Sequence, residues 1–361
     1  MLILLFFTLG SLLIGPRIFA QNTESSSEYF SKFSEHSNIT YDFSDWSFVL
    51  RNTVIRVGAS NRYKGKRPRP QTGHRISLAN PKPSWLEGNR IKYDTLTDEQ
   101  VDAILEYKEI VEAYPKAQNL SNLSKDAQLA YWLNLYNITV YAKIAKMYPL
   151  TSLKLLRKDG FWDKKQISVE GFNLSLNDIQ NKILIANWSS PLVIYGLYQG
   201  SIGGPNIQYS MFSAANVWEK LKFAGEDFVN SIRGTQKKGN VLRASKFYEW
   251  TKLAFPNFEG DLKDHLLSLA DEKTRKILNS TSAIKPNYYD WHITDLYNGY
   301  PKPMGTNPST VTMRDGRTYG GSMVKPIHAE TLVTNIITKF KVFGFPNTSV
   351  TIDEVAKVDK K

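Results

Sequence analysis

The sequence of 361 residues contains no cysteine and only five histidines. Without thiols the chain cannot form disulfides, thiolate metal sites or iron–sulfur clusters, and it has no cysteine nucleophile. No two histidines lie within five positions of each other, so the paired histidines of a helical zinc site are missing too. We therefore predict that the protein holds no metal and no cofactor.

Long hydrophobic runs are also missing, except at the N-terminus. Residues 1–15 carry no charged side chain and consist mainly of Leu, Ile and Phe, but a membrane-spanning helix needs about 20 apolar residues. Arg17 follows, and Ala20 is a small residue suited to cleavage before Gln21. This pattern predicts a signal peptide over 1–20, an exported protein in the periplasm or outside the cell, and no transmembrane span after cleavage. An uncleaved membrane anchor is the alternative.

Acidic residues are fewer than basic ones, 34 against 46, which gives a formal net charge of +12 at pH 7. Residues 51–75 hold eight Lys or Arg and no acid. Within them lies a proline-broken loop with the candidate polymer-binding residues Lys64, Lys66, Arg67 and Arg69. An exported basic loop fits an anionic envelope polymer as partner, whereas the export signal argues against nucleic acid. The alternative is a solvated strap that lies across the acidic side of its own domain.

The hydrophobic periodicity predicts helices mixed with short, separated strands, and therefore an α+β fold. Helices are expected over 97–114 (ended by Pro115), 124–147, 175–185, 213–230, 261–268, 271–278 and 329–339, and strands over 47–57, 166–174 (a hairpin), 193–198, 241–248 and 349–352. After the signal peptide we expect a leader with the basic, proline-rich segment (21–94), one main domain (95–298) and a C-terminal extension (299–361).

Four short stretches have a distinctive composition: LAYWLNLYN (129–137), FWDKK (161–165), LSLNDI (174–179) and YDW (289–291). In this order and spacing they resemble the DUF547 family, a bacterial and plant domain of unknown function. The resemblance implies a DUF547-like domain over 95–298, distantly similar to papain and transglutaminase folds, with the extensions of an exported bacterial subset. It implies no settled activity.

The chain departs from the family at the positions that have invited comparison with thiol enzymes. The family's typical segment, H-F-A-L-x-C-x-S-x-x-C-P, corresponds to residues 194–205. Ile194 stands where the family often has His, and Gln199 and Gly204 stand where it has Cys. Because a thiol mechanism needs a thiolate and a base, thiol chemistry cannot be transferred to this chain.

The same segment is polar and rich in glycine, directly after a predicted buried strand. Glycine allows positive φ and a close approach of the backbone to a ligand, and exposed N–H groups in such a turn can bind anions. The candidate ligand-binding residues are Gln199, Gly200, Gly203, Gly204 and Asn206. A tight turn with purely geometric glycines is the alternative. Ser201 is a candidate nucleophile, although it lacks the first glycine of the GxSxG motif.

Three further polar residues interrupt apolar or family motifs. Asn134 and Asn137 lie three positions apart on one side of the second predicted helix, where each amide needs a hydrogen-bond partner. They either position a ligand or hold a neighbouring loop. His292 lies between Asp290 and Asp295 and is a candidate base. An exposed turn histidine is the alternative.

These patterns predict an exported, envelope-associated binding or scaffold module without thiol chemistry, with a pocket formed by the glycine-rich turn and the two asparagines. The alternative is a cysteine-independent hydrolase or acyltransferase that acts on an envelope polymer or peptide. It would use His292 with Ser201 or a bound water, and the two side chains would have to face one cleft. The aromatic residues of the motifs are expected to share one core, namely Trp132, Tyr136, Phe161 and Trp291.

Overall fold

The computed structural model describes residues 25–66, 80–299, 310–312, 318–320 and 327–343. Helices dominate these residues, and small sheets of two or three strands complete them. The fold is therefore α+β, as the sequence predicts. The signal peptide expected over 1–20 and the strand expected over 349–352 lie outside the described residues.

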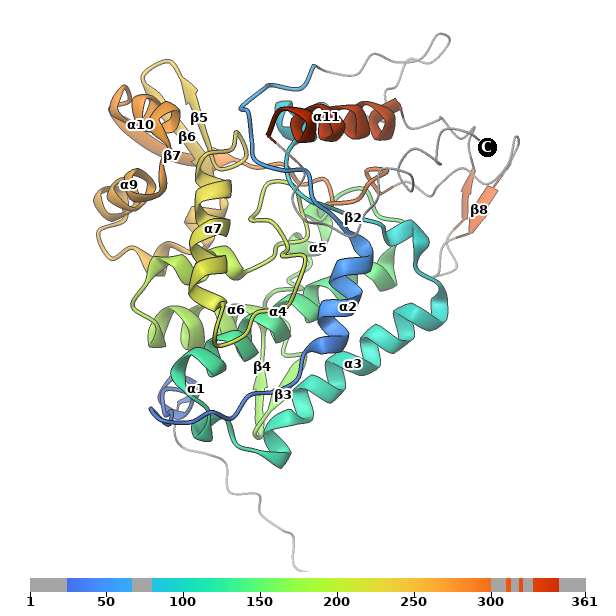
Figure 1. The fold of residues 1–361 in the computed structure, drawn as a ribbon, viewed down its shortest axis with the longest axis vertical. Helices are drawn as coiled ribbons and strands as arrows, with labels where there is room; N and C mark the ends of the chain where they lie inside the picture. The colour runs from blue at the N-terminus through green and yellow to red at the C-terminus, as the bar shows by residue number, and fades with distance from the viewer. Residues whose placement is uncertain (1–24, 67–79, 300–309, 313–317, 321–326, 344–361) are drawn as a thin grey trace, which may run out of the picture.

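The helix α4, Lys125–Met147, lies at the centre of the molecule with α3, Asp98–Ala117, beside it (Figure 1). Ser124 caps the start of α4, and Thr97 caps the start of α3 in a capping box. The prediction that Pro115 ends α3 is wrong, because the helix continues past it. The proline stands in the last turn, where its missing N–H removes a single backbone hydrogen bond.

The strand predicted over 47–57 is wrong. The chain forms the helix α2, Ser44–Thr53, and then the two-residue strand β1, Val54–Ile55. The β-branched residues of this segment favour a strand locally, but Trp46 and Leu50 are buried together on one side of α2. Packing of that apolar side against the core outweighs the local preference.

The strand predicted over 193–198 is also wrong, because the chain forms the 3-10 helix η5, Pro191–Gly196, there. Pro191 occupies the first helical position, and Ser190 accepts a hydrogen bond from Leu192 N. Both features favour the start of a helix. The segment is buried as its apolar composition predicts, and periodicity alone cannot separate a buried strand from a buried helical turn.

A three-stranded sheet and two helices form one end of the molecule, next to α7 (Figure 1). The elements are α7 (Val217–Val229), β5 (Thr235–Lys238), β6 (Val241–Ser245), α9 (Phe258–Leu269), α10 (Glu272–Asn279) and β7 (Ala283–Tyr288). β6 pairs antiparallel with β5 and parallel with β7. The connection from β6 to β7 therefore carries α9 and α10, at the positions predicted for two helices.

The predicted hairpin is confirmed as β3, Ile167–Val169, and β4, Phe172–Leu174. The remaining elements are short: α1 (Ser26–Tyr29), η1 (Pro83–Leu86), β2 (Arg90–Ile91, paired with β1), η2 (Tyr93–Thr95), η3 (Leu120–Asn122), α5 (Lys154–Lys158), α6 (Leu176–Asp178), the π-helix η4 (Ile179–Ile185), α8 (Phe247–Trp250), η6 (Lys252–Ala254), β8 (Thr310–Thr312) and β9 (Thr318–Gly320). In the described parts of the chain, no helix is both long and apolar enough for a membrane span.

One large hydrophobic cluster surrounds α4. Trp132, Tyr136 and Phe161 are buried in this cluster, and Trp291 is partly buried against it. The four aromatic residues from the family motifs therefore share one core.

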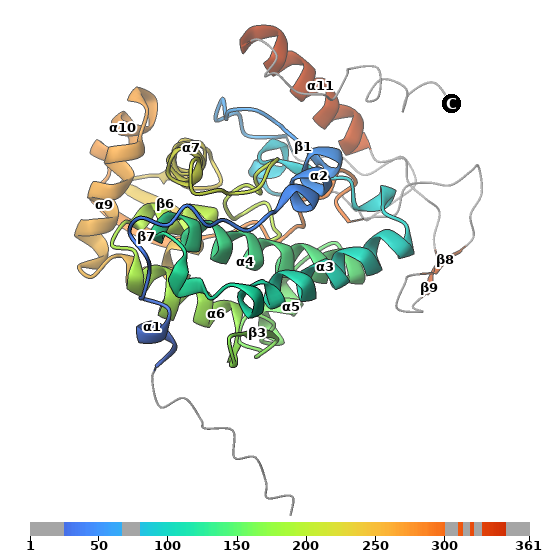
Figure 2. The same ribbon diagram turned by 60° about the horizontal axis from the view of Figure 1, so that its bottom comes forward.

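The helix α11, Ile327–Phe343, lies across the molecule from α6 and covers a second, smaller cluster (Figure 2). Its Leu332 and Ile336 pack against Trp85 and Leu86 of η1. The helix predicted over 329–339 is thus confirmed, and it closes over the N-terminal segment that carries β1 and β2.

Candidate functional site

Asn134 and Asn137 project from α4, and each holds a backbone segment with both of its polar atoms. Asn134 Nδ2 donates to Phe212 O at 2.8 Å, and its Oδ1 accepts from Phe212 N at 3.0 Å. Asn137 Nδ2 donates to Gly196 O at 2.9 Å, and its Oδ1 accepts from Tyr198 N at 3.0 Å. Both amides therefore satisfy buried backbone groups of neighbouring segments.

The glycines of the turn that follows η5 lie against other parts of the protein. Gly203 N donates to Asp290 O at 2.9 Å, and a Cβ atom on Gly203 would lie 2.6 Å from Asp290 N. Gly200 has a φ of +75°, and a Cβ atom there would lie 2.3 Å from Ile144 Cδ1. The space next to these glycines is therefore filled by the chain itself.

Gln199 and Ser201 of the turn are buried and hydrogen-bonded to tyrosines. Gln199 Nε2 donates to Tyr136 OH at 2.9 Å. Ser201 Oγ and Tyr289 OH share a hydrogen bond of 2.6 Å. A Cβ atom on Gly204 would lie 2.8 Å from Gln199 Cβ, so this part of the turn is closely packed. Neither polar side chain faces open solvent, since both are almost completely buried.

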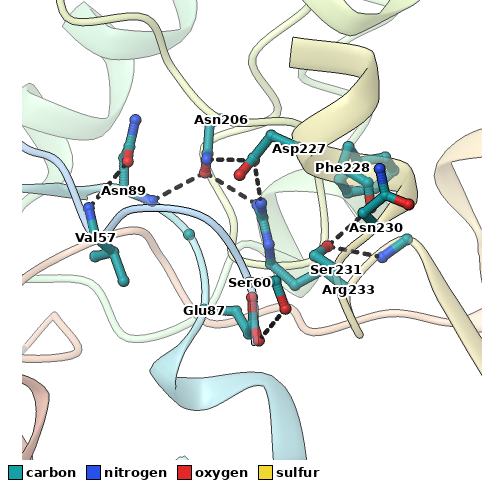
Figure 3. A network of polar contacts seen from close by, with 12 residues as sticks. Val57, Ser60, Glu87, Asn89, Asn206, Asp227, Phe228, Asn230, Ser231 and Arg233 are labelled. Carbon is teal, nitrogen blue, oxygen red and sulfur yellow. Dashed lines mark hydrogen bonds and ion pairs between the residues drawn. The ribbon is translucent and has the colours of Figure 1, made fainter. Parts of the chain in front are cut away.

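Asn206, at the end of the turn, belongs to a polar network that joins four segments (Figure 3). Its Oδ1 accepts from Asn89 N at 2.9 Å and from Arg233 Nη1 at 3.0 Å, and its Nδ2 donates to Asp227 Oδ2 at 2.7 Å. Arg233 Nη2 also donates to Asp227 Oδ2 at 2.9 Å. Burial raises the pKa of the Asp227 carboxyl, and the charge of Arg233 opposes that rise. Asn206 therefore stabilises a buried ion pair.

His292 forms a dyad with Asp290 of the YDW motif. His292 Nδ1 and Asp290 Oδ1 are 2.7 Å apart, and the imidazole is 25% exposed while the carboxylate is fully buried. Asp290 Oδ2 accepts from Asn80 Nδ2 and from Ser84 Oγ, each at 2.9 Å. Burial acts to raise the pKa of Asp290, but the hydrogen bonds and the charge of His292 outweigh it, so the pKa is lowered.

His292 and Ser201 lie on adjacent, bridged backbone segments but not on the same side of them. Ser201 pairs with Ile293 in an antiparallel bridge. Directly opposed residues point to the same side of a strand pair, and the next residue along points to the other side. Ser201 accordingly meets Tyr289, whereas His292 meets Asp290.

The first part of the basic segment is residues 58–66, which we call the strap. The strap is held to the rest of the protein by its backbone and by Arg62. Arg62 Nη1 donates to Asn230 O at 3.0 Å and to Thr274 Oγ1 at 3.2 Å. The side chains of Lys64 and Lys66 are exposed. Arg67 and Arg69, the other candidate polymer-binding residues, lie outside the described residues.

Three arginines were missed by sequence reasoning. Arg90 and Arg233 are fully buried; Arg90 donates to the carbonyl oxygens of Trp85 and Glu87, each at 2.6 Å. The third, Arg157 of α5, lies over two indole rings. No local pattern identifies any of them. Arg90 bonds to carbonyl oxygens of its own segment, whereas Arg157 and Arg233 also contact residues far away in the chain.

A cavity of about 200 Å³ lies elsewhere, beside α1 and η3, with Lys32 and Glu170 in its lining. None of the candidate residues lines it. Within the described ranges, no group of three or more His, Asp or Glu side chains is placed to hold a metal ion.

The described chain is thus an α+β protein built around a buried central helix that carries the AYWLN motif. Residues 120–229 match the family described as a protein of unknown function, DUF547. A DUF547 domain of unknown function is therefore present, and the match runs from η3 to the end of α7. No curated protein and no solved structure matches the chain, so the expected likeness to papain is not confirmed.

Proposed function

We propose that this protein is an exported, envelope-associated binding module that holds an anionic envelope polymer on its basic strap and loop, without thiol chemistry. The observation that carries the proposal is the contrast within the strap. Its backbone and Arg62 are held by the domain, while Lys64 and Lys66 extend into solvent.

The strap is fixed at several points along its length. Ser60 Oγ donates to Glu87 Oε1 at 2.7 Å, and Gly65 N donates to Pro83 O at 2.8 Å. Arg62 Nη2 donates to Thr235 O at 2.6 Å. A fixed backbone loses less conformational entropy when its side chains bind a ligand. These anchors therefore support the proposal that the strap presents its exposed lysines to an anionic polymer.

The positive net charge of the chain also supports an anionic polymer as the partner. The chain carries a formal net charge of +12 at pH 7, and clustered Lys and Arg attract polyanions over distances set by the salt concentration. The predicted signal peptide favours polymers of the envelope, such as peptidoglycan or phosphate-rich polysaccharide, over nucleic acid.

The second candidate function is a hydrolase or acyltransferase that activates a water molecule with His292. The observation in its favour is the dyad, because a buried carboxylate beside a partly exposed imidazole is the usual arrangement of a general base. Ser201 is less suited as the nucleophile, since it is buried against Tyr289 and points away from His292.

The test measures retention of the mature chain (residues 21–361) on sedimented peptidoglycan at low and high salt. The variant K64S/K66S/R67S/R69S should lose retention and keep its melting temperature. The control K116S/K222S/K238S/K285S removes the same charge from other exposed positions and should retain binding. Equal retention of the two variants would contradict the proposal, and a lower melting temperature of the first would favour a purely structural strap.

A further inference from the structure

The geometry points to a second binding site, in which Arg157, Trp250 and Trp291 recognise one carboxylated sugar unit. This inference rests on the proposed function for its class of ligand, an anionic envelope polymer. It concerns a different surface from the strap, and none of its residues belongs to the candidates derived from the sequence.

The Arg157 guanidinium is held between two indole rings. Its Cζ lies 4.9 Å from the ring centroid of Trp162 and 4.2 Å from that of Trp250. Both distances are within the range of cation–π attraction. Trp162 is buried, and its Nε1 donates to Tyr136 OH at 3.2 Å, so this ring is itself fixed to α4.

No described residue accepts a hydrogen bond from the N–H groups of the Arg157 guanidinium. Its guanidinium forms no hydrogen bond and no ion pair with any described residue, and the side chain is partly exposed. Arg233 is the contrast, because it is buried and donates to Gly204 O and to Asp227. A guanidinium fixed by stacking with free N–H groups is suited to a two-point bond with a carboxylate.

The partly exposed indole of Trp250 adjoins the guanidinium, and that of Trp291 adjoins Trp250. The ring centroids of Trp250 and Trp291 are 5.5 Å apart, and each lies 4.7 Å from that of Tyr289. Tyr289 is only 5% exposed and forms the buried side of this aromatic cluster. Two partly exposed indoles in contact with each other offer an apolar surface against which a sugar ring can pack.

The charge around the site favours an anion. The helix α5 carries no acidic residue within its bounds, and the exposed Asp159 caps its C-terminal end. Its Lys154 and Lys158 are exposed and precede and follow Arg157 in the sequence. A free phosphate would use the charge but leave the indole faces uncovered. A carboxylated sugar uses both, because its acid group meets the guanidinium while its ring packs on an indole.

The test titrates trigalacturonate, its neutral methyl ester and inorganic phosphate into the mature chain and measures binding by calorimetry and tryptophan fluorescence. The wild type should bind trigalacturonate best. R157Q should weaken that binding about tenfold or more, as expected for a charge-assisted two-point hydrogen bond. The matched control K158Q removes the same charge from the same helix and should change affinity less than about threefold, as expected for a surface charge.

Two more variants separate recognition from folding. R157K keeps the charge but lacks the planar fork, so it should bind trigalacturonate nearly as weakly as R157Q while keeping the wild-type melting temperature. W291L should weaken the binding of trigalacturonate and leave the binding of phosphate unchanged.

Three results would overturn the inference: no binding of trigalacturonate by the wild type, equal binding of the methyl ester, or unchanged binding in R157Q. Tight, Arg157-dependent binding of phosphate alone would also overturn it, in favour of a simple anion site. The strap variant K64S/K66S/R67S/R69S should keep trigalacturonate binding and lose retention on peptidoglycan. If the wild type is retained there but binds no trigalacturonate, this inference fails while the proposed function stands.

Discussion

His292 Nδ1 lies 2.7 Å from Oδ1 of Asp290, two residues earlier on the same segment. The pKa of Asp290 is lowered, so its carboxylate is ionised at neutral pH and can only accept a hydrogen bond. Nδ1 must then carry the hydrogen of this bond, and Nε2 is the ring nitrogen that does not contact Asp290. The pair therefore fixes the tautomer of the only histidine that the family motifs place near a carboxylate.

Asp290→Asn should destabilise the protein by about 2–4 kcal/mol at neutral pH. The side-chain N–H groups of the new asparagine would face the hydrogen-bond donors of Asn80, Ser84 or His292, which lose their acceptor. The lowered pKa of Asp290 contributes stability above the unfolded value of about 3.9, and that stability is lost as the pH falls through the folded value. The difference between wild type and variant should therefore shrink below about pH 4. Urea unfolding at several pH values measures it, and a constant difference would contradict the assignment.

Asp295 should give the opposite dependence on pH. It is buried, its Oδ2 accepts from Tyr297 N and Gly299 N at 2.8 Å each, and burial raises its pKa to about 7. The folded state then keeps a proton that the unfolded state loses above about pH 4, so the free energy of unfolding falls by up to about 1.4 kcal/mol per pH unit between these values. Asp295→Asn should flatten this slope, and an unchanged slope in urea unfolding would contradict the prediction.

Asn137→Ala should lower the free energy of unfolding by about 2–4 kcal/mol, because Gly196 O and Tyr198 N would lose their buried partner. Asn134→Ala should cost a similar amount at Phe212. The two asparagines hold different segments but lie one turn apart on α4, so the double variant measures the coupling between the two segments. Denaturant unfolding of the single and double variants tests this, and a cost below about 0.5 kcal/mol for either would indicate a free, ligand-facing amide.

The elements that the sequence predicts correctly are those with a strong local signal. α4 has a long apolar pattern and a capping serine, and the hairpin β3–β4 has alternation around Glu170 and Gly171. α2 and η5 were predicted as strands because their β-branched or apolar residues are buried by packing with remote segments, which a local pattern does not contain.

The candidate site, like the fold, could be predicted from the sequence only in part. The motif residues do come together, since Gly203 bonds to Asp290 and Ser201 meets Tyr289. What the sequence could not provide is the direction of each side chain. The bridge between Ser201 and Ile293 decides that His292 points away from the serine, and the stacking of Arg157 on Trp250 joins residues far apart in the chain.

Arg62→Ala should release the strap while leaving its exposed lysines in place. The variant loses hydrogen bonds to Asn230, Thr235 and Thr274, and we expect a loss of about 2–3 kcal/mol in unfolding free energy. Limited trypsin digestion should then cleave at Lys64 or Lys66 much faster than in the wild type. The control K64Q/K66Q should keep the wild-type stability, because neither side chain is buried. Unchanged stability and proteolysis of the Arg62 variant would show that the strap is not anchored by this residue.

Gly203→Ala should disrupt the contact between the glycine-rich turn and the dyad segment. The added Cβ would lie 2.6 Å from Asp290 N and 2.9 Å from Asp290 O, and because these are backbone atoms, the two segments must move apart. We expect a loss of about 2–4 kcal/mol, as for other overpacked buried sites. Gly260→Ala is the matched control, since nothing lies within 4 Å of its added Cβ in the first turn of α9. It should raise stability by about 0.5–1 kcal/mol through helix propensity. Thermal unfolding of both variants checks the pair, and equal small effects would mean that the turn does not rest on Asp290.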